Sequence, residues 1–359
     1  MERKIDFLFL FLFLFLLFFG FLILLSASFY PAQKRFNDPF YYLKHQLTLG
    51  VLGGLILGTL IFLLPSNFLK KISLPSFLIS LFLLLLTFVP GFANPANKTY
   101  RWINVFGFSF QPVELLKLTL ILYLGSWLES KTKRKKAYFL PFLIVLGIVS
   151  LFLLAQPNFS ALILIFGIAL SLFFLAKTPI YQTFLILGLG LISFFPLLKL
   201  APYRIKRLLT FLNPDLDPYG ISYHAIQSKV AIGSGGIFGK GIGFSEEKLG
   251  LLPHPFSDSI FAVFAEEFGF VGVCFLLFLF LILFLRIYQI GKRQTDDFKK
   301  LTIFGILTWF FFQTTINIGA MSGLLPLTGI PLPFVSYGGS HLMVEIGACF
   351  LILKFSRET

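Results

Sequence analysis

Charged residues are scarce in this chain, and cysteines are almost absent. Asp, Glu, Lys and Arg together make up 13% of the 359 residues, whereas a soluble domain carries about a quarter. The two cysteines, Cys274 and Cys349, both lie in apolar segments and are too few for a disulfide framework or a metal site. The composition therefore argues against a water-soluble domain, and we expect both cysteines to pack as small apolar side chains.

Apolar residues dominate instead. Hydrophobic residues make up 57% of the chain and include 50 phenylalanines, more rings than the soluble core of such a chain could bury. A net charge of +14 would suggest nucleic acid as the partner of a soluble protein. Here the lysines and arginines lie between long apolar runs, so we expect membrane lipids and an anionic lipid ligand, and no nucleic acid.

About ten apolar segments are long enough to span a bilayer as helices. They lie at 7–26, 46–64, 73–89, 112–128, 138–155, 159–176, 181–200, 266–286, 301–320 and 340–355. The first could be a signal peptide, because the sequence SAS at 26–28 resembles a cleavage site, but the long apolar run favours a retained helix. We therefore expect an all-α fold, with residues 1–359 forming a single polytopic membrane domain of about ten transmembrane helices.

The loops between these segments differ in charge. Lysines and arginines are concentrated in both chain ends and in short loops near 70, 131–136, 177 and 286–300, so the positive-inside rule places both termini in the cytoplasm. The loop at 201–258, between the seventh and eighth helices, then lies outside and is by far the longest. A long loop in a compact protein is either functional or disordered, and the apolar residues interleaved here favour ordered structure.

The glycine run GSGGIFGKGIG at 233–243 looks like a phosphate-binding loop. A Walker A motif would need glycine where Ser234 stands, and serine or threonine where Gly241 stands. We therefore do not expect nucleotide binding. Glycines also let a main chain approach a helix or a lipid headgroup closely, which is the better interpretation.

Charged residues gather near the outer ends of the spans. Glu114 and Lys117 lie three residues apart at the start of one helix. Such residues form a structural ion pair or line a polar entrance, since charges inside a membrane are costly unless paired or facing a cavity. The preceding loop contributes Arg101.

The long outer loop adds cations and a carboxylate. Its stretch YRIKR at 203–207 includes Arg204 and Arg207, which could attract lipid headgroups or clamp a diphosphate. Asp258 stands where the loop meets an apolar helix. There it could cap the helix, or it could act as a general base, because an apolar wall tunes the affinity of a carboxylate for protons. His254 could also titrate, although such a histidine is more often a plain surface residue.

The last outer loop is rich in glycine and proline, and its sequence is GLLPLTGIPLPFVSYGGS at 323–340. Irregular backbone at membrane depth is tolerated only where protein or water covers it, so this run predicts a re-entrant hairpin beside a site. His341 and Glu345 follow at a spacing of four, but two ligands alone do not indicate a metal site.

Seven ordered blocks of the chain resemble the SEDS family of shape, elongation, division and sporulation proteins. They are FNDPFYYLKHQL (36–47), RWINVFGFSFQPVELLKL (101–118), AQPNFSALIL (155–164), YRIKRLLTFLNPDLDPYG (203–220), YHAIQSKVAIGSGGIFGKGIG (223–243), LLPHPFSDSIFAVFAEEFGF (251–270) and GLLPLTGIPLPFVSYGGS (323–340). The first and fourth blocks resemble the FtsW branch more than the RodA branch. The resemblance covers nearly the whole chain.

The resemblance implies a ten-helix peptidoglycan glycosyltransferase of the bacterial plasma membrane, which polymerises lipid II into glycan strands during division or elongation. It implies a class B penicillin-binding protein as partner, with other divisome or elongasome membrane proteins. The essential family Asp matches Asp258, and the family's loop Arg and helix Glu and Lys match Arg101, Glu114 and Lys117. The chain departs from the family pattern at Asn158, Ser259 and His341, where the family carries Asp, Phe and Ser.

On this basis we expect Asp258 to take the proton from the acceptor sugar's 4-hydroxyl as that oxygen attacks the donor's anomeric carbon with inversion. Polyprenyl diphosphate leaves, stabilised by nearby cations. No protein metal site is expected, although a divalent cation, Mg²⁺ or Mn²⁺, could assist. The residues assigned to substrate binding are Arg101, Glu114, Lys117, Arg204, Arg207, Lys240 and Ser336. The alternatives are a flippase or transporter for lipid-linked sugar and a non-catalytic scaffold for the transpeptidase.

Overall fold

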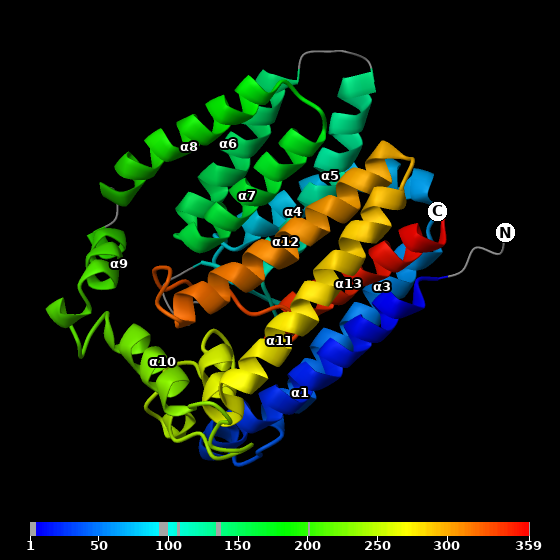
Figure 1. Cartoon of the computed structure of the whole chain (residues 1–359). Helices are drawn as coiled ribbons and strands as arrows, with labels where there is room; N and C mark the ends of the chain where they lie inside the picture. The colour runs from blue at the N-terminus through cyan, green and yellow to red at the C-terminus, as the bar shows by residue number, and fades with distance from the viewer. Residues whose placement is uncertain (1–4, 93–99, 106–107, 134–137, 200–201, 359) are drawn as a thin grey trace.

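The computed structural model describes residues 5–92, 100–105, 108–133, 138–199 and 202–358 (Figure 1). Its first half contains α1 (Phe7–Phe36), α2 (Tyr41–His45), a π-helix (Gln46–Leu52), α3 (Gly53–Leu63), α4 (Ser66–Leu86), β1 (Ile103–Val105), β2 (Phe108–Phe110), α5 (Pro112–Lys133), α6 (Phe139–Ala155) and α7 (Phe159–Leu175). Its second half contains α8 (Ile180–Lys199), α9 (Pro202–Leu212), α10 (Tyr223–Ser234), α11 (Ile260–Arg293), α12 (Asp297–Met321) and α13 (Gly339–Arg357), with short 3-10 turns at Pro214–Leu216 and Glu247–Leu249.

The protein is a polytopic all-α membrane protein. Within the described residues, six helical stretches are long and apolar enough to cross a membrane: α1, the run Tyr41–Leu63, α4, α11, α12 and α13. Three shorter apolar helices, α6, α7 and the Ile180–Ser193 part of α8, accompany them. Together with α5, which carries charges at both ends, these elements correspond one for one to the apolar segments expected from the sequence.

The first helix is longer than expected, and the long loop is ordered, as the sequence favoured. The first helix continues through Pro31 to Phe36, ten residues past the expected end, and stops only where Asn37 adopts a left-handed conformation (φ 54°) and donates its backbone N–H to the Gln33 carbonyl oxygen. The long loop contains two further helices, α9 and α10. Hydropathy alone misses both features because they lie at the edge of the apolar runs or outside them.

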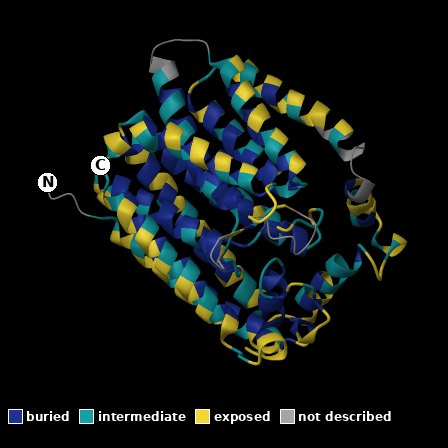
Figure 2. Ribbon diagram, turned by 180° about the vertical axis from the view of Figure 1, so that it is seen from behind, coloured by how far each residue is buried: buried dark blue, intermediate teal, exposed yellow. Residues whose placement is uncertain are grey.

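Helix α13 occupies the centre of the bundle. It packs on α3, on the π-helix and on α5, and 83% of its apolar stretch is buried inside the molecule, compared with 39% for α1. Figure 2 shows the same arrangement, with exposed residues on the outward faces of the peripheral helices and buried residues between them. Helices α9 and α10 form an arm that leads from the end of α8 to the start of α11 (Figure 1).

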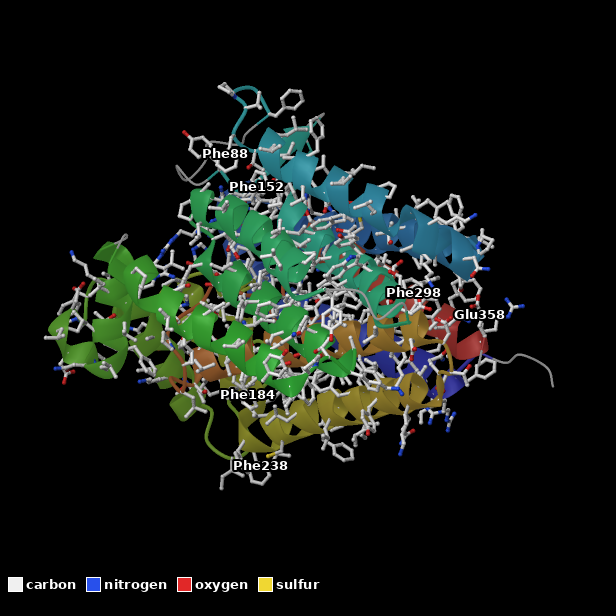
Figure 3. All side chains as sticks on the ribbon, turned by 90° about the horizontal axis from the view of Figure 1, so that it is seen from above. Phe88, Phe152, Phe184, Phe238, Phe298 and Glu358 are labelled. Atoms are coloured by element: carbon white, nitrogen blue, oxygen red, sulfur yellow. The ribbon has the colours of Figure 1, made fainter. Side chains whose placement is uncertain are left out.

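Both ends of the described chain lie at one end of the bundle, which we call the terminal face. The backbone N–H of Asp6 donates to Ser356 Oγ (3.3 Å), and the Asp6 carboxylate pairs with Arg286 (2.7 Å). Lys299, near the start of α12, pairs with Glu358 here (2.8 Å), and Figure 3 shows Glu358 at this end. The opposite end, which we call the loop face, holds the β1–β2 hairpin, α9, α10 and the segments 235–259 and 322–338.

Helix lengths show where the loop face meets the membrane boundary. From Phe7 to Ser26 α1 rises ~28 Å, and from Asp297 to Asn317 α12 rises ~30 Å, at ~1.5 Å per residue. The hydrocarbon layer of a bilayer is ~30 Å thick. Ser26 and Asn317 therefore lie near the boundary on the loop-face side.

The segment 322–338 dips below that boundary, as its Pro/Gly pattern predicts. A Cβ on Gly20 of α1 would lie 2.4 Å from the carbonyl oxygen of Phe334, and Gly20 is ~9 Å deeper along α1 than Ser26. Leu332, Phe334 and Val335 are buried. The irregular backbone is thus covered by protein, which is what membrane depth requires.

Candidate active site

Asp258 lies two residues before α11, and its main chain is held by hydrogen bonds from two other parts of the chain. The Asp258 carbonyl oxygen accepts from Asn317 Nδ2 (2.9 Å), and the preceding carbonyl of Ser257 accepts from Ser336 Oγ (2.7 Å). The backbone N–H of Tyr337 donates to the Phe256 carbonyl oxygen (2.9 Å). Helix α12 and segment 322–338 therefore fix the position of Asp258, and its carboxylate takes no part in this clamp.

Asp258 is partly exposed as a residue, and several positively charged groups act on its carboxylate. Burial raises the pKa of Asp258, while the charges of His254, Arg207 and Arg101, together with a hydrogen bond from Ser257, act to lower it. A carboxyl in such surroundings has a greater affinity for protons than an exposed one, but the neighbouring cations still favour its ionised form. This is the balance that a general base requires.

Charges from three structural elements influence one another at this carboxylate. Arg101 comes from the approach to the β1–β2 hairpin, Arg207 from α9, and Asp258 from the start of α11. A Cβ on Gly329 would lie 3.4 Å from Asp258 Oδ2, so segment 322–338 forms one wall. The structure thus brings together three of the predicted site residues from separate regions of the sequence.

Arg101 is oriented by the turn between α6 and α7. Its Nε donates to the carbonyl oxygen of Gln156 (3.3 Å) and its Nη2 to that of Pro157 (2.5 Å). Next in the chain, Asn158 accepts from the backbone N–H of Ala161 (3.4 Å) and caps α7. The asparagine that replaces the family's aspartate therefore keeps a helix-capping role that needs no charge.

The two arginines of the YRIKR stretch have different surroundings. Arg204 is buried, donates from Nη1 to the Leu197 carbonyl oxygen (2.7 Å) and lies 4.7 Å from the ring centroid of Phe159. It therefore ties α9 to α8 and α7. Arg207, on the next turn, is exposed. Of these two residues, it is Arg207 whose charge acts on Asp258.

Glu114 and Lys117 form a buried ion pair (2.6 Å) at the start of α5. Glu114 also contacts Nδ1 of His341 (3.2 Å), and Lys117 donates to Gln313 Oε1 (3.1 Å) and lies 4.8 Å from the Trp309 ring centroid. Helices α5, α12 and α13 are joined by these contacts.

Glu345 connects this buried network to the clamp around Asp258. Its Oε1 contacts His341 Nε2 (3.1 Å), and its Oε2 accepts from the backbone N–H of Phe334 (2.9 Å) in segment 322–338. His341, which stands where the family carries serine, therefore lies between the carboxylates of Glu114 and Glu345. No group of three or more His, Cys, Asp or Glu side chains in the described part of the chain could hold a metal ion.

The side chains of Lys240 and Ser336 are both engaged by protein groups. Lys240 pairs with Glu266 (2.8 Å) and Glu246 (3.6 Å). Ser336 is buried, and its hydroxyl accepts from the Leu332 N–H (2.8 Å) while donating to Ser257. Ser336 supports the loop that carries Asp258, and Lys240 holds the glycine run to α11.

The glycine run packs main chain against main chain on a kink in α11. Gly269 interrupts that helix with φ 66° and ψ −167°, and a Cβ there would lie 2.2 Å from the nitrogen of Gly239. The N–H groups of Lys240 and Gly241 donate to the carbonyl oxygens of Glu266 and Glu267 (2.9 and 3.0 Å). The interpretation of the run as a close-approach segment is therefore supported by its contacts with a helix.

Two residues of the site had no role assigned from the sequence. Asn317 donates from Nδ2 to the carbonyl oxygens of both Asp258 and Ile330 (2.9 and 2.8 Å). His224 contacts Ser259 Oγ through Nε2 (2.5 Å). A buried amide within an apolar span was a usable signal for Asn317, but nothing in the sequence indicated the partner of His224.

His224 is a neutral hydrogen-bond donor in this arrangement. Burial, with the charges of His254 and Arg207, lowers its pKa to about 4. The Ser259 hydroxyl donates to the Pro253 carbonyl oxygen (2.8 Å), so the proton between Ser259 and His224 belongs to Nε2. The serine that replaces the family's phenylalanine thus joins α10 to the start of α11.

Comparison with known proteins adds a family and a fold. The family model FtsW/RodA/SpoVE, described as "Cell cycle protein", matches residues 6–359. A relative from Geobacter sp. (strain M18), named "Probable peptidoglycan glycosyltransferase FtsW", is 36% identical over 95% of this chain and 93% of its own.

Two solved structures share the fold. One is described as "Structural coordination of polymerization and crosslinking by a peptidoglycan synthase complex"; it has 28% identity, covers 99% of this chain and 98% of its own, and gives a TM-score of 0.79. The other is the rod shape determining protein RodA of Thermus thermophilus; it has 26% identity, covers 99% and 97%, and gives a TM-score of 0.72.

Proposed function

This chain belongs to the FtsW/RodA/SpoVE family of cell cycle proteins, and we propose that it is a peptidoglycan glycosyltransferase that polymerises lipid II into glycan strands. One observation carries the proposal. The charges of Arg101 and Arg207 act on the Asp258 carboxylate. The main chain of Asp258 binds Asn317, which the rise of α12 places near the boundary between bilayer and water. Lipid II has its diphosphate and sugars at that level and its polyprenyl tail in the bilayer.

In the proposed reaction Asp258 removes the proton of the acceptor sugar's 4-hydroxyl. The oxygen forms a bond to the donor's anomeric carbon as the bond from that carbon to the diphosphate oxygen breaks, which inverts the configuration. The polyprenyl diphosphate leaves with the electron pair. Arg101 and Arg207 are the cations best placed to stabilise its charge, since guanidinium groups bind phosphate oxygens in a bidentate manner.

The other predicted residues act at a distance from the reacting atoms in this proposal. The pair Glu114–Lys117 and the residues Arg204 and Ser336 hold the elements that carry Asp258 and Arg207. A divalent cation that arrived with the substrate would take its ligands mainly from the diphosphate.

We further propose that the loop face is extracytoplasmic, in the bacterial plasma membrane, and that a class B penicillin-binding protein crosslinks the strands made here. The distribution of lysine and arginine supports this orientation. The structural neighbour described as a peptidoglycan synthase complex coordinates polymerisation with crosslinking, which supports a partner of this kind.

The decisive experiment is polymerisation of purified lipid II by Asp258→Asn protein in liposomes with the transpeptidase present. We expect glycan product to fall by at least ~10²-fold, the usual contribution of a general base. Asp215→Asn is the matched control, because Asp215 is an exposed carboxylate in the same long loop, and it should retain full activity. Undiminished polymer from Asp258→Asn would contradict the proposal.

The same liposomes distinguish the two alternatives. Translocation of labelled lipid II without polymer would indicate a flippase. Transpeptidase binding with neither polymerisation nor translocation by the unmodified protein would indicate a scaffold.

A further inference from the structure

The glycine run 233–243 and the residue that follows it present a group of large apolar side chains that the proposed reaction does not use. Ile237, Phe238, Ile242 and Phe244 are between 64% and 81% exposed. We call these four residues the apolar loop patch. Figure 3 shows Phe238 pointing away from the molecule beside α11. On a loop surrounded by water, four such side chains would be unfavourable.

The polar groups beneath the patch are turned inward. Lys240 pairs with Glu266, and the buried Lys248 pairs with Glu267 (2.5 Å). Glu267 also accepts from Ser26 Oγ of α1 (2.7 Å). The segment therefore presents large apolar side chains outward while Lys240 and Lys248 pair with carboxylates of α11, and Glu246 is its exposed acidic residue.

Several main-chain groups of the run are also paired, because the kink at Gly269 frees carbonyl groups of α11. The carbonyl oxygens of Glu266 and Glu267 accept from the run. In return, the N–H groups of Phe270 and Val271 donate to the carbonyl oxygens of Gly236 and Ile237 (2.9 and 3.1 Å). Paired backbone groups are a requirement for any segment that leaves water for lipid.

The rise along two helices, α11 and α1, places the run at the bilayer boundary. From Arg286, at the terminal face, α11 rises ~24 Å to Phe270, where the run is attached. Along α1 the rise from Phe7 is ~28 Å to Ser26, which accepts from Lys248 Nζ (3.1 Å). These distances are ~6 Å and ~2 Å short of the ~30 Å hydrocarbon thickness, so the run lies close to the boundary.

The patch is continuous with a surface that faces lipid. Phe270 and Val271 adjoin it and are exposed, and Phe275 and Phe278 extend the exposed apolar surface along α11, a helix that is long and apolar enough to span the membrane.

We propose that the apolar loop patch inserts into the bilayer leaflet on the loop-face side, at the boundary between headgroups and acyl chains. The occupant of this surface is lipid. The glycine run then fixes the depth of the first part of α11, and with it the depth of Asp258. This inference concerns the resting protein in a membrane and holds whatever reaction Asp258 performs.

Site-directed spin labelling in vesicles of zwitterionic and anionic phosphatidyl lipids tests the proposal. Single labels are placed through Phe238→Cys and Phe244→Cys in a background carrying Cys274→Ser and Cys349→Ala. Collisions with molecular oxygen, which concentrates in lipid, are compared with collisions with a water-soluble nickel chelate. Tyr219→Cys is the aqueous reference because Tyr219 is 93% exposed in the same long loop, and Phe278→Cys is the lipid reference.

We expect both patch labels to collide with oxygen at least several-fold more than the Tyr219 label relative to nickel, at a shallower depth than the Phe278 label. Nickel accessibility equal to that at Tyr219 would overturn the proposal. Low accessibility to both reagents would also overturn it, because protein would then cover the patch. Ile237→Cys and Ile242→Cys repeat the test at smaller side chains if a phenylalanine replacement prevents folding, as judged by monodispersity in detergent.

Discussion

The carbonyl groups of Phe256, Ser257 and Asp258 accept hydrogen bonds from Tyr337, Ser336 and Asn317. The carboxylate is thus positioned through its main chain, and its charge is tuned separately by neighbouring side chains. Position and proton affinity can therefore be altered one at a time.

Replacing Arg207 should change the proton affinity of Asp258 and leave the main-chain position of Asp258 unchanged. Because the Arg207 charge lowers the pKa of Asp258, Arg207→Gln should raise that pKa further. The base acts in its ionised form, so the acid limb of the pH–rate profile should move to higher pH, and added salt should reduce the difference from the unmodified protein. Lys206→Gln, an exposed neighbour on α9, should leave the limb in place. An acid limb that does not move in Arg207→Gln would mean that Arg207 does not act on Asp258.

Replacing Asn317 should instead alter the position of the Asp258 main chain. Asn317→Leu leaves the buried carbonyls of Asp258 and Ile330 without their donor, at a cost of about 1–3 kcal/mol in stability. We expect a lower thermal midpoint and a reduced rate at saturating lipid II, with the acid limb unshifted. Thr314→Val is the control on the same helix, since Thr314 Oγ1 is buried with no hydrogen-bond partner among the described residues; its removal should be neutral. A stable and fully active Asn317→Leu protein would contradict the positioning role.

Sequence reasoning identified Asp258 through its place at a loop–helix junction and through the family resemblance. It could not identify the donor that Asn317 supplies, because that role depends on carbonyl groups 59 and 13 residues away in the chain. Ser336 was assigned to substrate, yet its hydroxyl is buried against Ser257. A hydroxyl in a Gly/Pro loop carries no local sign of which partner it will meet.

At the scale of elements, apolar runs predicted the spans well because a helix must carry a long apolar run to cross the hydrocarbon layer, and few other structures contain one. The predicted helix 138–155 corresponds to α6 at Phe139–Ala155. Helix α9 was missed because its composition is amphipathic, with Ile205 and Leu209 exposed among cations, and it needs no continuous apolar run.

The junction between the glycine run and α11 supports a prediction of its own. Gly269→Ala would force a residue with a Cβ into a backbone region that only glycine adopts readily, at a cost of about 1–3 kcal/mol. The added Cβ would also collide with the Gly239 nitrogen. Thermal unfolding in detergent should show a clearly lower midpoint for this variant.

Gly233→Ala is the matched control for that substitution. Gly233 lies within α10, and a Cβ there meets no described atom within 4 Å, so stability should stay the same or rise slightly. Equal midpoints for Gly269→Ala and the unmodified protein would show that the kink is not required.

At the scale of the whole molecule, the network around Glu114 and Lys117 joins α5, α12 and α13 across the centre of the bundle. Lys117→Met should lower stability by about 3–5 kcal/mol because it leaves a buried carboxylate without its closest cation. Adding Glu114→Gln removes that charge, so the double variant should recover most of the loss in thermal midpoint. A double variant no more stable than Lys117→Met would exclude the ion pair as the cause.

The first helix meets partners that are synthesised late. Asp6 binds Arg286 and Ser356, and Ser26 binds Glu267. During synthesis, α1 therefore enters the membrane long before α11 and α13 are made. Until then it lies in the bilayer without these packing partners. Residues 7–26 contain no charged side chain, so lipid can surround this part of α1 on every side before its partners are made. Packing of α1 against α11 and α13 is then a late step of biogenesis.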